Sequence, residues 1–108
     1  MRRIFTLAAL IIVLFQGCGM NTVRLENNYG IKAMQMNLNR EAEFRFRKLI
    51  EKDPSDWAAR NNLGVCLEKQ GRYEEALAQY EAALEIIKTN RGVEVNKRRV
   101  TEILEKND

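Results

Sequence analysis

Two cysteines are the residues of this chain best suited to chemistry, because a thiolate is both a nucleophile and a metal ligand. Cys18 follows Gly17 near the start of the chain, and Cys66 lies among apolar residues in the second half. The sequence contains no histidine, so a Cys-His mechanism is excluded. It also shows no glycine-rich phosphate loop and no run of residues with metal-ligand spacing. We therefore expect neither an enzyme nor a site for a metal or a cofactor.

The segment before Cys18 is typical of an export signal. Arg2 and Arg3 precede an uncharged apolar run from Ile4 to Phe15. As a helix, this run would extend about 18 Å, whereas the hydrocarbon core of a bilayer is about 30 Å thick. The run is too short to span a membrane, and its basic start and apolar centre predict a secretory signal peptide.

Gly17-Cys18 resembles the lipobox, the sequence at which bacterial lipoproteins are cleaved and diacylated on the cysteine sulfur. Phe15 and Gln16 stand where that family usually has leucine and a small residue. The resemblance implies a lipoprotein signal peptide over residues 1–17, followed by a lipidated Cys18 and a short tether over residues 18–25. Several acyl chains together hold a small domain on a bilayer, since each buried methylene contributes about 0.8 kcal/mol.

The same resemblance bears on localisation and partners. In a host with two membranes, Gly19 in place of aspartate resembles the pattern that is sorted to the outer membrane, where the protein would face the periplasm. The alternative is a soluble periplasmic or secreted protein. Without Arg2 and Arg3, the chain keeps 16 basic residues against 15 acidic ones. This balance gives no case for nucleic acid as the partner.

A pattern that recurs at a constant offset organises the rest of the chain. Asn27-Asn28-Tyr29-Gly30 returns as Asn61-Asn62-Leu63-Gly64, and Glu41-Ala42 returns as Glu75-Ala76. Within one unit, apolar residues recur at spacings of three and four, which is the period of a helix. The offset falls within the range of about 20–50 residues that is typical of repeat architectures. The pattern therefore predicts an array of helical hairpins.

Residues 57–90 resemble a tetratricopeptide repeat. The residues on the signature places of that family are Leu63, Gly64, Leu67, Gly71, Tyr73, Ala76, Tyr80 and Ala83. Residues 23–56 resemble a degenerate copy, in which Asn37 replaces the turn glycine and Asn39 replaces the turn aromatic residue. The resemblance implies an all-α fold, a short array of two helical hairpins.

Turn residues divide this array. The expected helices cover residues 23–36, 40–52, 56–70 and 73–88. Asp53-Pro54-Ser55 separates the two copies, because proline disfavours helix in the residue before it and Ser55 can cap the next helix. Thr89 to Gly92 is the next expected break.

After that break, an apolar stripe over residues 93–106 predicts a helix that caps the open end of the array. The alternative is that Lys97, Arg98 and Arg99 make this helix a basic surface for anionic lipid or an acidic partner. Basic residues also crowd residues 40–52, and acidic residues crowd residues 74–85. We expect these to be solvated faces that attract each other modestly across the repeat boundary, with a docking surface as the alternative.

The family resemblance implies a function in protein binding, through a concave groove that is lined by the first helix of each hairpin and accepts a peptide. The matching positions are Arg24, Asn27, Ile31, Met34, Asn61, Val65, Glu68 and Lys69. Asn27 and Asn61 are the strongest candidates, because an exposed amide can both donate to and accept from a peptide backbone. The alternative is that they only solvate a helix face.

We therefore expect a membrane-tethered, non-catalytic scaffold or assembly factor for a protein partner in the bacterial cell envelope. Helical arrays normally need three or more repeats, so a small structural lipoprotein that forms homo-oligomers through its incomplete first copy is the alternative. Cys66 is expected to be a small buried apolar residue. The alternatives are that Cys66 acts as a nucleophile or forms an intermolecular disulfide.

Overall fold

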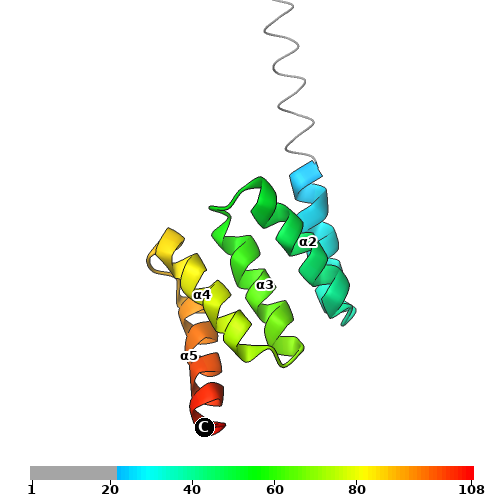
Figure 1. Ribbon diagram of the computed structural model, residues 1–108. Helices are drawn as coiled ribbons and strands as arrows, with labels where there is room; N and C mark the ends of the chain where they lie inside the picture. Colours follow the sequence, from blue (N-terminus) through cyan, green and yellow to red (C-terminus); the bar gives the residue numbers. More distant parts are fainter. Residues whose placement is uncertain (1–21) are drawn as a thin grey trace, which may run out of the picture.

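The computed structural model describes residues 22–108, and all regular secondary structure in this part of the chain is helical (Figure 1). Residues 22–35 form the first described helical segment. The helices that follow are α2 (Asn39–Lys52), α3 (Trp57–Lys69), α4 (Tyr73–Ile87) and α5 (Arg91–Lys106). The expected all-α class, two helical hairpins followed by a final helix, is confirmed. The leader, Cys18 and the start of the tether lie outside the described residues.

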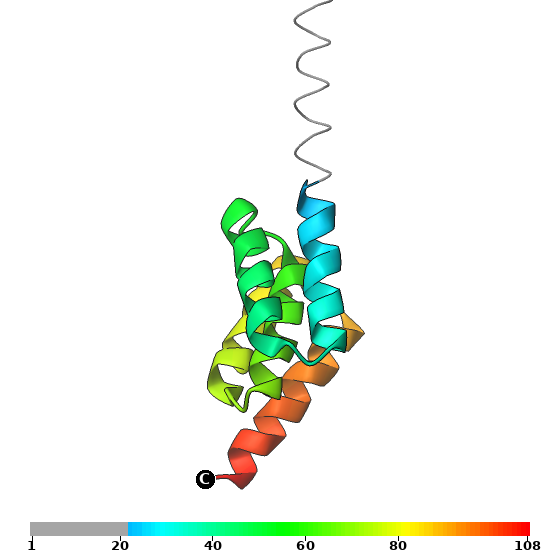
Figure 2. The same cartoon turned by 90° about the vertical axis from the view of Figure 1, so that its right-hand side faces the viewer.

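The hairpins repeat with the register that the sequence predicts. The helix of residues 22–35 lies beside α2 as the first hairpin (Figures 1 and 2). The number of residues between the starts of α2 and α4 equals the number between Asn27 and Asn61, which is the repeat step. The starts of α3 and α5 are separated by the same step. We call two residues that are related by this step counterparts. By this register, α5 occupies the place of the first helix of a third repeat, although its residue types do not follow the family signature.

Each hairpin closes around a glycine on its first helix and an aromatic ring on its second. A Cβ atom on Gly64 would lie 2.5 Å from Cε1 of Tyr80, and a Cβ atom on Gly30 would lie 2.8 Å from Cζ of Phe46. Both rings are fully buried in the core. The missing side chains at the two glycines therefore set the distance between the paired helices.

The turns within the two hairpins use residues in the left-handed region. Gly71 has φ +75°, and Asn37, the residue in place of the turn glycine, has φ 58°. Asparagine adopts this backbone conformation more readily than most residues, so the first hairpin keeps the turn. The other replacement is costly, because Oδ1 of Asn39 is buried without a hydrogen-bond partner among the described residues.

Two helix starts differ from the sequence-based expectation. Asp56, and not Ser55, caps α3: the Asp56 side chain accepts a hydrogen bond from the backbone N–H of Ala59 at 2.9 Å. The Ser55 hydroxyl donates instead to Asp53. α5 begins at Arg91, inside the expected break, because Oδ1 of Asn90 accepts from the N–H of Val93 at 3.1 Å. An asparagine cap thus outweighs the glycine in the first turn.

α5 packs on α4 and touches α3, and its exposed side chains are polar or charged apart from Val95. Val93 and Val100 are 1% and 0% exposed. The outer face has polar residues where their counterparts in α3 are apolar: Arg98 for Gly64, which packs against Tyr80 of the second hairpin, and Thr101 for Leu67. A further helix packed there as α4 packs on α3 would meet charged side chains, so the apolar core ends at α5.

Candidate protein-binding site

The residues matched to the family's peptide groove lie on the helix of residues 22–35 and on α3. Exposed positions are Arg24, Ile31 and Lys69, and half-buried positions are Asn27, Met34, Asn61, Val65 and Glu68. Met34 and Val65 pack against the core. Ile31, which is 37% exposed, is the apolar side chain of this set that is most open to a ligand.

Asn61 is not a free amide, because α5 supplies its partner. Oδ1 of Asn61 accepts a hydrogen bond from Nδ2 of Asn96 at 3.0 Å. Arg99 donates to both carboxylate oxygens of Glu68, at 2.9 and 2.8 Å, and to Oδ1 of Asn96 at 2.9 Å. α5 therefore engages two of the eight expected groove residues, and Asn96 and Arg99 join the candidate site.

This polar network reaches the core through Tyr80. The Tyr80 hydroxyl donates to Oε2 of Glu68 at 3.5 Å. Burial raises the pKa of Tyr80, so the phenol stays a neutral donor, and the hydrogen bond to Glu68 raises the pKa of Arg99. Glu68 thus links the aromatic ring that closes the second hairpin to the final helix.

Ion pairs within the first hairpin use part of the positive charge of α2. Arg45 and Lys48 lie 3.0 and 3.2 Å from the carboxylate oxygens of Glu26. Hydrogen bonds from Arg45 and then Lys48 lower the pKa of Glu26. The second hairpin has a contact at the same place between different groups. Arg60, the counterpart of Glu26, donates to Oε1 of Gln79, the counterpart of Arg45, at 3.4 Å. Arg45 and Lys48 therefore hold their own hairpin together.

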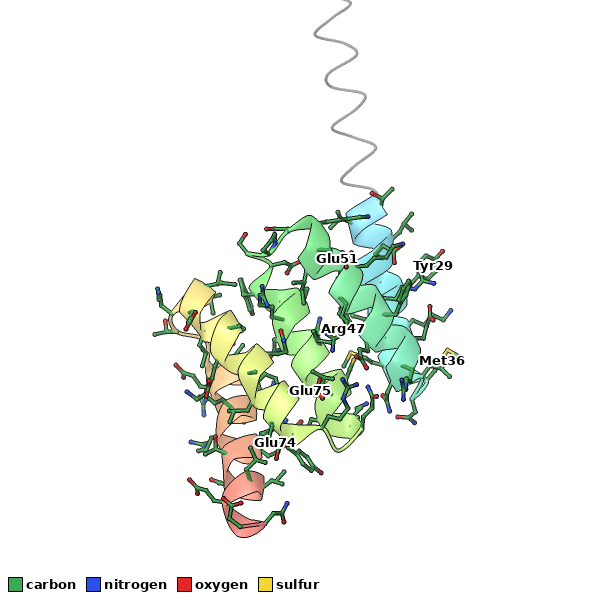
Figure 3. All side chains as sticks on the ribbon, in the orientation of Figure 1. Tyr29, Met36, Arg47, Glu51, Glu74 and Glu75 are labelled. Atoms are coloured by element: carbon green, nitrogen blue, oxygen red, sulfur yellow. The ribbon has the colours of Figure 1, made fainter. Side chains whose placement is uncertain are left out.

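The ion pairs between α2 and α4 differ from the expected pairing of bases on α2 with acids on α4. Figure 3 shows Arg47 on α2 and Glu75 on α4 on the same side of the molecule, and their charged atoms are 4.0 Å apart. The shorter contact joins an acid of α2 to a base at the start of α4, with 2.8 Å between Glu43 and Arg72. Desolvation opposes the charge of Glu43, but hydrogen bonds from Gln70 and Arg47 outweigh it and lower the pKa of that carboxyl.

Cys66 is fully buried, as expected. Burial raises the pKa of its thiol to about 11, so at neutral pH it is protonated and a poor nucleophile. Within residues 22–108, no group of cysteine and carboxylate side chains could hold a metal ion. In the same part of the chain, no helix has both the length and the apolarity to cross a membrane.

Comparisons with known proteins support this architecture. The profile described as tetratricopeptide repeat matches residues 30–90. Among solved structures, MamA AMB-1 is similar with a TM-score of 0.70 and 24% sequence identity over 77% of this chain, and a mutant of MamA gives the same three values. The chain spans 49% and 46% of those two structures, about half of each. No curated protein sequence matches the chain.

Proposed function

The chain belongs to the tetratricopeptide repeat family, and from this premise we propose that it is a non-catalytic scaffold that binds a protein or peptide partner in the bacterial cell envelope. In this proposal, acyl chains on Cys18 tether it to the membrane. The observation that supports binding most is the register of the first helices, since the starts of α3 and α5 are one full repeat apart. Equivalent side chains then recur from helix to helix, along a surface that an extended partner can follow.

The peptide site would lie mainly on the first repeat. Hydrogen bonds to α5 already use Asn61 and Glu68, whereas Asn27 and Ile31 stay accessible on the helix of residues 22–35. Ile31 would supply the apolar anchor, and the Asn27 amide would bond to the peptide backbone. Arg24, Val65 and Lys69 would extend the contact.

We expect the substitution Ile31→Glu to weaken peptide binding at least about tenfold, a loss of about 1.4 kcal/mol, because it puts a charge where an apolar anchor must be desolvated. The measurement is the affinity of peptides selected from a displayed library against the full chain. Ile86→Glu on α4 is the matched control, since Ile86 is also 37% exposed. Equal losses in both variants, or none in Ile31→Glu, would argue against the proposed site.

The tether is tested separately by the substitution Cys18→Ser in a bacterial host. We expect the unsubstituted protein to partition into detergent and to have the mass of an acylated chain that begins at Cys18, because several acyl chains bind a bilayer firmly. The variant should lack the acyl mass and should no longer be cleaved at this position. An unsubstituted protein that is water-soluble and unacylated would instead support the soluble periplasmic or secreted alternative.

A further inference from the structure

A stripe of exposed side chains runs along the helix of residues 22–35, and into the turn that follows it, at the open end of the described array. Leu25, Tyr29, Lys32 and Met36 are spaced by four, three and four positions, the spacing with which two helices pack side by side. Leu25, Tyr29 and Met36 are 51%, 54% and 60% exposed. Figure 3 shows Tyr29 and Met36 pointing outward from the same edge of the molecule. We call these four residues the end stripe.

The counterparts of the end stripe show that this row of residues is normally covered. In α3 the row consists of Ala59, Leu63, Cys66 and Gln70, the first three of which are at most 1% exposed. In α5 it consists of Val93, Lys97, Val100 and Leu104, and both valines are at most 1% exposed. Among the described residues, the same row is thus mostly covered in the second and third units, although the Lys97 side chain is 43% exposed, and it is open in the first.

The cover over the row of α3 is the preceding helix, α2. Gln70, the counterpart of Met36, donates to Oε1 of Glu43 at 3.1 Å. Leu63, the counterpart of Tyr29, lines a surface hollow together with Arg47 and Ile50. Residues 43, 47 and 50 are themselves spaced by four and three, so a helix with this spacing is what fits the row.

Lys32 decides what kind of helix would fit the end stripe. It is the only charged residue of the stripe, and it takes part in none of the ion pairs described within residues 22–108. A lysine inside an otherwise apolar seam selects a partner with an acid opposite it. A second copy of this chain would bring the same stripe, which contains no acidic residue, so the two lysines would lack a partner.

We propose that the end stripe binds an amphipathic helix of another protein, in the place that α2 takes over α3. The incoming helix carries two large apolar residues seven positions apart, which cover Met36 and Tyr29. Between them, four positions after the first, it carries an acidic residue that pairs with Lys32. This surface is separate from the peptide site around Ile31, and the protein would join two partners at once.

The probe for this surface is a helix-stapled peptide that copies α2 with two changes, Glu43→Leu to cover Met36 and Arg47→Glu to meet Lys32. We expect it to bind the full chain, purified in mild detergent, saturably in a fluorescence anisotropy titration. A second peptide keeps Arg47 and carries only Glu43→Leu. It should bind at least about tenfold more weakly, because its arginine faces Lys32.

Variants of the full chain locate the contact. Tyr29→Asp should weaken binding of the first peptide at least about tenfold, and Lys32→Glu should reverse the preference between the two peptides. Phe44→Asp on α2 is the matched control, since Phe44 is 57% exposed but lies outside the end stripe. Ile31→Glu should leave binding of this probe unchanged, which separates the end stripe from the peptide site.

Three results would overturn the proposal. One is an absence of saturable binding, or binding that is equally strong in the Tyr29→Asp variant. Another is sedimentation that shows concentration-dependent dimers lost in Tyr29→Asp, because the occupant would then be a second copy. The last is binding to phosphatidylglycerol vesicles of the Cys18→Ser protein that depends on Tyr29 while neither peptide binds, because the stripe would then contact a lipid surface.

Discussion

Replacing Gly64 by alanine is expected to lower the free energy of unfolding by about 2 kcal/mol or more, because it overpacks the core. The new methyl group would lie 2.5, 2.8 and 2.9 Å from three atoms of the Tyr80 ring. That ring is fully buried, so it cannot yield without displacing the core, and overpacking of this kind costs about 1–3 kcal/mol and occasionally more. The higher helix propensity of alanine returns at most about 1 kcal/mol. Urea unfolding followed by circular dichroism measures the difference.

Two controls make this result specific to the contact with Tyr80. Gly92→Ala, at the exposed start of α5, should change the stability by less than about 0.5 kcal/mol, because the tight contact of the new Cβ, at 3.3 Å, is with Oδ1 of Asn90, the end of a side chain that can shift by a few tenths of an ångström. In the double variant with Tyr80→Leu, the cost of Gly64→Ala should shrink, since the smaller side chain leaves room. Additive losses in that cycle would mean that the Tyr80 ring is not what limits the site.

The hairpins were predictable because their geometry depends on contacts that are close in sequence. Gly64 and Tyr80 belong to the same unit, and the constant offset between the two copies marks both units independently of the details. Gly71 and Asn37 adopt the left-handed turns expected of them. The errors arose at helix ends, where two capping residues compete and the sequence does not rank them. At the start of α3, for example, Asp56 and not Ser55 is the capping residue.

The candidate site was harder to predict because it depends on the contact between α3 and α5. Asn61 and Asn96 are 35 residues apart, and Glu68 and Arg99 are 31 apart. Nothing in the family signature marks residues 91–106 as the first helix of a third repeat. The hydrogen-bond partners of Asn61 and Glu68 therefore could not be assigned from the sequence. The signal that could have found them is the register itself, since Val93 and Val100 are the counterparts of Ala59 and Cys66.

The two ends of the array differ in a way that the sequence pattern left open. At the C-terminal end, Arg98 and Thr101 replace residues that would pack against a further helix. At the N-terminal end, Leu25 and Tyr29 keep the apolar character of the covered row while remaining more than half exposed. Within residues 22–108, the helix of residues 22–35 therefore leaves its apolar row uncovered, and the second hairpin is covered by α2 on α3 and by α5, chiefly on α4.

Deleting residues 91–108 is expected to abolish cooperative unfolding of the remaining chain. The deletion removes Val93 and Val100, and burying a valine side chain fully contributes about 1.5–3 kcal/mol. It also exposes the apolar surface of α4 and α3 that these residues cover. The summed loss, about 5 kcal/mol, equals the lower limit of the total stability of a typical domain. Thermal unfolding by circular dichroism should then lose its sigmoidal transition.

Packing, and not charge, is expected to dominate this loss. Arg99→Ala removes both hydrogen bonds to Glu68, but its side chain is 46% exposed, so we expect a cost of about 1 kcal/mol or less, which salt reduces further. Val100→Ala should cost more, because it leaves a cavity at a site with no exposure. Arg98→Ala on the outer face should be nearly neutral. If the Arg99 variant lost more stability than the Val100 variant, the polar network around Glu68, and not apolar packing, would hold α5 in place.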